Sequence, residues 1–243
     1  MPDKGPHSHI VTSFEDELAG LDQMVARMGG MAELQLARAF DALERRDPDL
    51  AEAAIRTDKA IDALEREIED ACISLIARRQ PMALDLRQIM TAMRIASDLE
   101  RIGDLAKNIA KRALAVSGEN HPKTLMLGLR HMVELVQREL KEVLDAYASR
   151  NAARAIEIWR RDDEIDAMYN SLFRELLTYM MEDPRNIGLC THLLFGAKNI
   201  ERIGDHATNI AETVHFLVKG VKLGEDRPKG DTTSTTRFTP DEV

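Results

Sequence analysis

Acidic residues that recur at a fixed spacing are the side chains in this sequence best placed to do chemistry. The word Glu-Arg-Ile-Gly-Asp occurs twice, at 100–104 and at 201–205, with its two carboxylates four positions apart. On a helix, side chains at this spacing project from one face. Two pairs of aspartates with the same spacing precede the two words along the chain. The candidate site residues are Asp58, Asp62, Glu100, Asp104, Asp162, Asp166, Glu201 and Asp205.

These carboxylates occupy helix positions that the sequence pattern reserves for a hydrophobic core. The apolar series Leu86, Met90 and Met93, continued by helical steps, reaches Glu100 and then Asp104. The second copy of the word repeats this arrangement. The aspartate pair of the second half also shares a face with apolar residues, whereas the pair of the first half lies nearer the edge of its apolar stripe. Four carboxylates in each half, two from each of two helices, are therefore expected to converge on one groove.

Converging carboxylates need a neutralising partner. Repulsion and lost hydration cost several kcal/mol unless the groups are protonated, paired with cations or bound to metal. Oxygen ligands alone suit magnesium, manganese or iron better than structural zinc. The alternative is a set of salt bridges across a solvated groove. The arginines near the acidic pairs that could form them are Arg56, Arg101, Arg160 and Arg202.

Other residues near the repeated words carry weaker signals. Gly103 and Gly204 either make room for a bulky cluster or serve simple helix packing. His206 has Leu105 as its counterpart in the first half, so it is not a repeated ligand. The sequence has no Gly-rich phosphate loop, no GxSxG and no HExxH, and it lacks the Glu-x-x-His of ferritin-like di-iron proteins. We therefore predict a protein without catalytic activity.

The amino-acid composition indicates that helices hold the acidic pairs. Aromatic residues make up only 4%, while helix-forming aliphatic and charged residues abound. A net charge of −9 without a basic cluster argues against nucleic-acid binding. No run of apolar residues is long enough for a membrane span and no signal peptide is recognisable, so we expect a cytoplasmic protein. Cys72 and Cys190 lack metal or redox spacing and are expected to be buried thiols.

Prolines divide the chain into long periodic segments. Asp47-Pro48 and Asp183-Pro184 each read as an N-cap followed by proline in the first helical turn. The predicted helices span residues 13–46, 48–79, 82–116, 122–149, 151–181 and 184–220.

The chain also repeats itself at a longer period. At an offset of 101, nine of the eleven residues of 100–110 recur in 201–211, and segments further upstream match at an offset of 104. This period is too long for a solenoid and indicates a duplicated three-helix unit. We predict an all-α fold of two tandem antiparallel three-helix bundles related by internal duplication. The predicted domains are 10–117 and 120–220, followed by a disordered tail at 221–243.

This combination resembles the PhoU family of phosphate-signalling proteins, over about residues 10–220. The features that carry the resemblance are an acidic pair on the second helix of each bundle and the repeated word, followed by Asn-Ile-Ala, on the third. The resemblance implies that the family's metal motif falls on Glu100 and Asp104 and on Glu201 and Asp205, faced by the aspartate pairs. It implies mononuclear or multinuclear clusters of a metal that differs among members, with iron and zinc both possible.

The resemblance also implies a function. PhoU proteins are cytoplasmic negative regulators that bridge the ATP-binding subunit of the phosphate ABC transporter and a membrane sensor histidine kinase, and dimers are common among them. We accordingly expect a homodimer that contacts the membrane only through its partners. Two alternatives remain, a carboxylate-bridged metalloenzyme and a helical adaptor that binds no metal.

Overall fold

A computed structural model describes residues 6–119 and 123–224, and within these ranges all regular secondary structure is helical. The all-α prediction is thus confirmed. The first bundle contains α1 (Pro6–Arg45), α2 (Pro48–Arg79) and α3 (Leu84–Ala115). The second contains α4 (Lys123–Ala148), α5 (Ala152–Trp159), α6 (Asp162–Glu182), the 3-10 turn η1 (Pro184–Asn186) and α7 (Ile187–Lys219).

Capping and backbone conformation define the helix ends, and one of these ends recurs in both halves of the chain. Asp47 caps α2, because its Oδ1 accepts hydrogen bonds from the backbone N–H groups of Asp49 at 2.9 Å and Leu50 at 3.1 Å. Arg46 and Arg150, 104 positions apart, follow the first helix of each bundle with φ of 57° and 53°. The same left-handed residue therefore ends the first helix in both halves.

The predicted single helix 151–181 is wrong, because the chain breaks between α5 and α6. Arg160 and Arg161 form a turn there, and α6 begins with the acidic run Asp162, Asp163 and Glu164. Negative side chains in a first turn are stabilised by the partial positive charge of the helix N-terminus. The equivalent stretch of the first half remains inside the continuous helix α2. The remaining helix predictions hold to within a few residues, apart from α1, which begins earlier.

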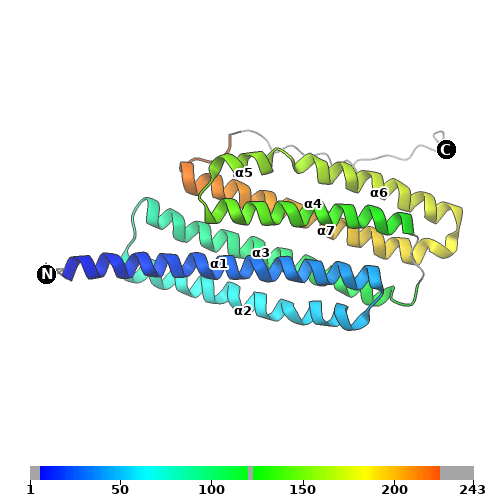
Figure 1. The fold of residues 1–243 in the computed structure, drawn as a ribbon, viewed down its shortest axis with the longest axis horizontal. Coiled ribbons are helices and arrows are strands. Elements are labelled where there is room, and N and C mark those ends of the chain that lie inside the picture. The colour runs from blue at the N-terminus through cyan, green and yellow to red at the C-terminus, as the bar shows by residue number, and fades with distance from the viewer. Residues whose placement is uncertain (1–5, 120–122, 225–243) are drawn as a thin grey trace.

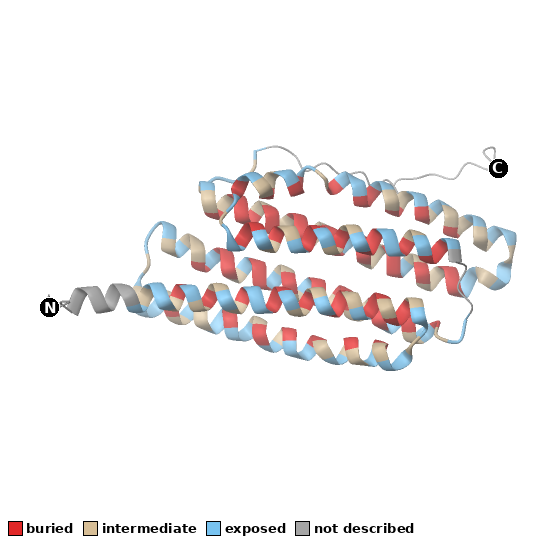
Figure 2. Ribbon diagram, viewed as in Figure 1, coloured by how far each residue is buried: buried red, intermediate tan, exposed pale blue. Residues whose placement is uncertain are grey.

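The two bundles lie side by side rather than end to end (Figure 1). α3 packs against α7 and α1 against α4, and the buried apolar side chains form one continuous core through both bundles. Figure 2 shows the buried positions, in red, distributed along the helices of both bundles. His206 lies in the α3–α7 interface, where its Nδ1 is 2.8 Å from Oδ1 of Asp98. It thus has a structural contact between the bundles.

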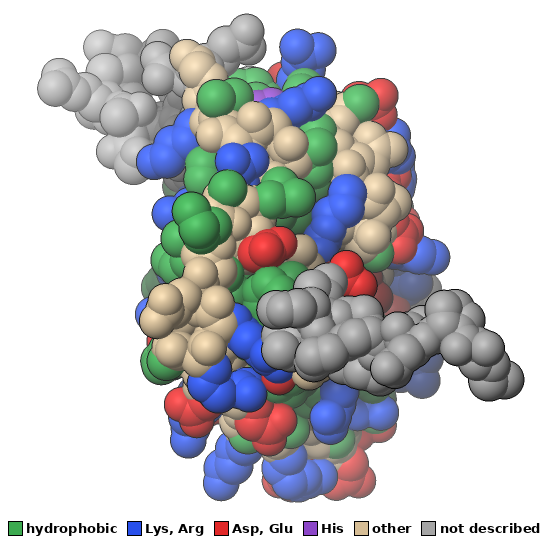
Figure 3. All heavy atoms as spheres, turned by 90° about the vertical axis from the view of Figure 1, so that its left-hand side faces the viewer, with side chains coloured by type: hydrophobic (Ala, Val, Ile, Leu, Met, Phe, Trp, Pro, Cys, Tyr) green, Lys and Arg blue, Asp and Glu red, His purple; other side chains and the backbone are tan. Residues whose placement is uncertain are grey.

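The ends of the molecule carry exposed apolar side chains. Met82 and Leu84, in the α2–α3 connection, are 80% and 59% exposed. The α2–α3 connection lies at the left-hand end of the molecule in Figure 1, and Figure 3 shows hydrophobic side chains among Lys and Arg on that end. Of the predicted tail, residues 225–243 lie outside the described part of the chain. No helix in that part is long and apolar enough to cross a membrane.

Candidate functional site

A lysine joins the carboxylates of the first bundle, which we call the first cluster (Asp58, Asp62, Glu100 and Asp104). Nζ of Lys107 lies 2.6 Å from Oδ2 of Asp58 on α2 and 2.5 Å from Oδ1 of Asp104 on α3. Asp58 is buried even though its sequence position suggested the edge of the stripe. Burial opposes the charge of the ammonium, but its hydrogen bonds to Asp104 and Asp58 outweigh this and raise the pKa of Lys107. The lysine therefore stays protonated and binds the two helices together.

The outer part of the first cluster remains half-exposed. Burial and the negative charge of Asp104 raise the pKa of Glu100, against the opposing effect of Arg101. Nε of Arg101 lies 3.5 Å from Oε2 of Glu100, and its guanidinium is 3.8 Å from Asp104. Glu65 on α2 adds a further carboxylate, and its pKa is also raised by burial and by neighbouring acidic groups that include Asp62. Several negative charges thus crowd one α2–α3 groove.

The corresponding second cluster (Asp162, Asp166, Glu201 and Asp205) is more deeply buried. Glu201 is only 4% exposed, and desolvation raises its pKa to about 7, aided by Asp205 and Asp166. Lys198 opposes this shift, because its Nζ lies 2.8 Å from Oε1 of Glu201. The other oxygen, Oε2, is buried and has no hydrogen-bond partner. A buried, unsatisfied carboxylate oxygen favours either a proton or a cation beside it.

The first aspartate of each pair is held from the same position of the facing helix. In the second cluster, Oγ1 of Thr208 on α7 donates a hydrogen bond of 2.9 Å to Oδ1 of Asp162 on α6. Thr208 is the counterpart of Lys107 at the offset of 101, and Asp162 is the counterpart of Asp58 at the offset of 104. At this position a hydroxyl therefore contacts Asp162, where an ammonium contacts Asp58 in the first half.

The structure brings the aspartates and glutamates of each half to the same pair of helices, α2–α3 in one bundle and α6–α7 in the other. Salt bridges do form in this region, as the alternative interpretation expects, but three of its four arginines do not supply them. Arg56 pairs with Glu52 instead of an aspartate of the cluster, and Arg160 and Arg202 are exposed. Of those four arginines, Arg101 contacts the cluster. The closest cations are the lysines Lys107 and Lys198, which sequence reasoning missed because they are not repeated.

The two glycines of the repeated words serve close helix packing. A Cβ atom on Gly103 would lie 3.2 Å from Cδ1 of Ile61, and one on Gly204 would lie 2.7 Å from Cδ1 of Ile165. These isoleucines are counterparts on α2 and α6. Of the two interpretations of the glycines, the packing interpretation is the one that fits these contacts.

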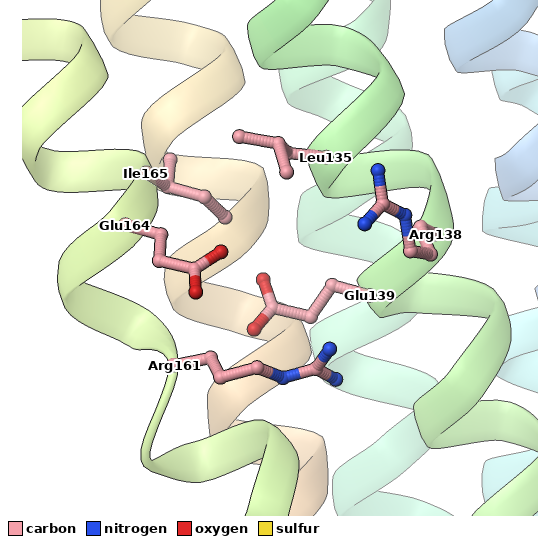
Figure 4. A pocket seen from close by; sticks show the side chains of 6 residues that line it. All are labelled: Leu135, Arg138, Glu139, Arg161, Glu164 and Ile165. Carbon is pink, nitrogen blue, oxygen red and sulfur yellow. The ribbon is translucent and has the colours of Figure 1, made fainter.

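A small cavity of about 20 Å³ beside the second cluster contains residues that the repeat does not reveal. Figure 4 shows Glu139 of α4 and Glu164 of α6 turned toward one another, with the guanidinium of Arg161 beside Glu139. Glu139 is buried and stands where the first half has Gln35. The signal that could have found it is its place on the apolar stripe of α4, the same signal that selected the other carboxylates.

In both clusters a lysine already lies beside the carboxylates that were expected to bind a metal ion. Within residues 6–119 and 123–224, no three His, Cys, Asp or Glu side chains are preassembled as a metal site. In the first cluster, Lys107 already fills the space between two of the expected ligands. In the second cluster, the buried Oε2 of Glu201 is an unsatisfied donor atom that suits a hard cation. Lys198, whose Nζ lies 2.8 Å from Oε1 of Glu201, gives the second cluster an ammonium of its own.

The fold and the two clusters define a class of protein, all-α chains of two packed three-helix bundles in which each bundle carries facing acidic pairs. The sequence profile of the PhoU domain matches this chain twice, at residues 25–113 and 129–214. The chain belongs to the PhoU family.

Individual proteins agree with this assignment. The phosphate-specific transport system accessory protein PhoU homolog of Rhizobium meliloti is 56% identical over 94% of this chain and 97% of its own. The crystal structure of PhoU from Pseudomonas aeruginosa matches with a TM-score of 0.83 and 40% identity, over 86% of this chain and 100% of that one. The phosphate transport system regulatory protein PhoU from Streptococcus pneumoniae gives a TM-score of 0.81 and 31% identity, over 87% and 100%.

Proposed function

We propose that this chain is an accessory protein of a phosphate-specific transport system and a negative regulator of phosphate uptake and of the phosphate-starvation response. The observation that carries the proposal is the 56% identity to the Rhizobium meliloti accessory protein over nearly the full length of both chains. The Streptococcus pneumoniae relative, described as a regulatory protein of phosphate transport, supports the regulatory part.

The proposed mode of action is that of a cytoplasmic adaptor without catalytic activity. It would bridge the ATP-binding subunit of the phosphate transporter and a sensor histidine kinase, act as a homodimer and reach the membrane only through its partners. The exposed apolar side chains of Met82 and Leu84 support a role in protein contacts, because such groups at a surface favour association. The net charge of −9 disfavours nucleic acid as a partner.

Metal-ion binding by the acidic clusters is part of the proposal. The ion would be iron, zinc, manganese or magnesium, and when bound it would neutralise carboxylates that otherwise repel one another. The residues that would hold it are the carboxylates of the two clusters, among which Glu201 is nearly fully buried and Asp166 and Asp205 add negative charge.

Deletion of the gene tests the regulatory function. We expect phosphate-starvation genes to be expressed in phosphate-rich medium when the gene is deleted, and to be repressed again when the intact gene is restored. A reporter fused to a phosphate-starvation promoter measures this. Unchanged reporter activity in the deletion strain would contradict the proposal.

Capture of partners from cells grown in high phosphate tests the adaptor mode. The intact chain should retain the transporter ATPase and the kinase, both identified by mass spectrometry. The double variant Met82→Ser/Leu84→Ser should lose one of them, while Leu127→Ser, which changes an equally exposed leucine on α4, should retain both. If neither protein is captured by the intact chain, the adaptor mode is wrong even when the reporter result stands.

A further inference from the structure

One corner of the molecule is basic, although the chain as a whole is acidic. Residues 78–94 run from the end of α2 into α3, and residues 213–224 include the end of α7. Together these two segments contain six Lys or Arg and one acidic residue, Asp85, in a chain with a net charge of −9. Positive charge is therefore concentrated where the two segments lie.

Contacts of Arg87 hold the two segments together. Its Nη1 donates a hydrogen bond of 3.4 Å to the backbone oxygen of Leu217, and its guanidinium lies over the ring of Phe216, 5.6 Å from the centroid. Arg94 lies over the same ring at 5.7 Å. A Cβ on Gly220 would lie 2.5 Å from Nη1 of Arg87, so glycine makes room for this contact. Two guanidinium groups are thus positioned beside the end of α7.

Exposed apolar side chains lie on the same two segments. Met82 and Leu84 follow the end of α2, and Val221 follows the end of α7. Two exposed lysines, Lys219 and Lys222, flank Val221. Figure 3 shows hydrophobic side chains among Lys and Arg on this end of the molecule. We call the surface the basic corner and define it by two apolar and four basic residues, Met82, Leu84, Arg87, Arg94, Lys219 and Lys222.

The chemistry of the basic corner selects a partner that is both acidic and apolar. Exposed apolar side chains gathered on one surface favour association, and complementary charge orients the partner. Methionine is flexible and adapts to the irregular surface of a bound protein segment. Guanidinium groups bind carboxylates through two parallel hydrogen bonds. An acidic protein segment with apolar side chains would satisfy all of these groups.

Two observations favour a protein segment over a lipid surface. Residues 78–94 and 213–224 contain no Trp or Tyr, the aromatic residues enriched where proteins meet a membrane interface. Two of the six cations, Arg78 and Arg79, are already paired with Glu17 at 3.3 Å and 3.0 Å. The four that remain are at the lower limit of the basic clusters that hold anionic lipids, about four to eight residues.

We propose that the basic corner is the docking surface for an acidic segment of a partner protein, whose carboxylates meet the four cations while its apolar side chains cover Met82 and Leu84. The inference rests on the proposed adaptor role and adds the chemistry of one contact that the adaptor makes. Because the rest of the chain is acidic, it repels such a segment elsewhere, which directs the segment to this corner.

Two synthetic peptides test the chemistry of the surface. One is an amphipathic helix of about fourteen residues, roughly four turns, with leucine on one face and glutamate on the other. The second peptide has lysine in place of glutamate. The full-length chain should bind the glutamate peptide more tightly in fluorescence anisotropy, in spite of its own net charge of −9. Tighter binding of the lysine peptide would overturn the proposal.

Charge reversal locates the binding site. Lys219→Glu/Lys222→Glu should weaken binding of the glutamate peptide roughly tenfold or more. Lys59→Glu/Lys111→Glu makes the same change in net charge at two exposed lysines outside the corner and should weaken binding much less. All four lysines are exposed, so both variants should melt at the temperature of the intact chain. Equal losses of affinity would show an effect of net charge alone and overturn the proposal.

Vesicles made of equal parts phosphatidylserine and phosphatidylcholine test the lipid alternative. The intact chain should stay in the supernatant when the vesicles are sedimented. Sedimentation that Lys219→Glu/Lys222→Glu abolishes would make the corner a lipid-binding surface and overturn the proposal.

Photo-crosslinking in cells tests the surface with natural partners. Benzoylphenylalanine is placed at position 82 and, as a control, at Leu127, an exposed position on α4. The crosslink specific to position 82 should join the chain to a protein segment in which Asp and Glu outnumber Lys and Arg, and Lys219→Glu/Lys222→Glu should abolish it. A crosslink to lipid or to residues 225–243 of the chain itself, or none above the control, would overturn the proposal. If the intact chain still represses the phosphate-starvation reporter, the proposed function stands without this surface.

Discussion

At the scale of residues, the second bundle contains one carboxylate in an unusually apolar setting. Glu201 is almost fully buried on α7, has a single oxygen paired with Lys198, and carries a pKa raised to about 7 mainly by desolvation. Its counterpart Glu100 is half-buried and lies beside Arg101. The same residue in the same repeated word is therefore held in two different electrostatic environments.

Glu201 should make the stability of the metal-free protein depend on pH. Because its pKa in the folded chain, about 7, lies above the ordinary 4.5, the folded state binds the proton more tightly than the unfolded state does. This contribution is fully present below pH 4.5 and is lost as the pH rises through about 7. The shift corresponds to at most about 3 kcal/mol.

Glu201→Gln should accordingly remove this dependence. Urea unfolding in the presence of a chelator, repeated between pH 5 and pH 8, would measure it. We expect the variant to be more stable than the intact chain at pH 8 and to differ little from it at pH 5. A variant with the same pH dependence as the intact chain would contradict the assigned environment of Glu201.

At the scale of elements, the helix ends and the helix crossings are specified by few residues. Asp47 caps α2 with two backbone hydrogen bonds, and Asn151 caps α5 by accepting from the N–H of Arg154 at 3.0 Å. The approach of α6 to α7 depends on Gly204, because Ile165 occupies the space that a side chain there would need. Asp47 begins the helix that carries Asp58 and Asp62, and Gly204 lies between Glu201 and Asp205 on α7.

Asp47→Ala should destabilise the protein by about 1 kcal/mol, since two N–H groups of the first turn of α2 lose their acceptor. Asp49→Ala removes a neighbouring exposed carboxylate of the same turn without removing the cap, and should cost less. Thermal unfolding of both variants gives the comparison. Equal losses would mean that helix-dipole charge, and not capping, is what stabilises this end of α2.

Gly204→Ala should be less stable than Gly196→Ala by about 1 kcal/mol or more. A Cβ on Gly196 meets no atom within 4 Å, so that change should gain helix propensity, whereas a Cβ on Gly204 meets Cδ1 of Ile165 at 2.7 Å. Ile165→Val removes that methyl group. The double variant Gly204→Ala/Ile165→Val should therefore be more stable than the sum of its single changes, and additive effects would argue against this contact.

At the scale of the whole molecule, the two bundles are joined by a broad interface between α3 and α7. Arg112 stacks over the ring of Phe195 at 4.7 Å, and Asp98 contacts His206. One apolar core continues through both bundles. On its own, the first bundle would expose the surface of α3 that packs on α7. The second bundle would expose the matching surface of α7.

The two bundles should therefore unfold together. Calorimetry of the intact chain is expected to show one cooperative transition whose calorimetric and van't Hoff enthalpies agree. The expressed fragment 1–117 should associate or aggregate, because separation exposes the face of α3 that packs on α7. Two resolved transitions, or a monomeric and cooperatively folded fragment, would contradict this coupling.

The all-α fold could be predicted from the sequence because its signals are local and repeated. Helical periodicity and the Asp-Pro caps can be read from residues that are close together in the sequence. The period near 100 residues comes from direct comparison of the two halves. The break between α5 and α6 was missed, although Asp162, Asp163 and Glu164 form a typical acidic first turn. No Pro or Gly interrupts residues 151–181, so the proline punctuation and the helical periodicity did not reveal the turn at Arg160 and Arg161.

The sequence by itself determined that the two carboxylates of each pair lie on one helix face, since helical spacing fixes which side chains share a face. Only the tertiary structure decided which cations meet them. Lys107 and Lys198 contact the clusters because facing helices and side-chain reach bring them there, and neither is marked by the repeat. Burial likewise separates Glu201 from Glu100, because the desolvation of a carboxylate depends on every element packed around it.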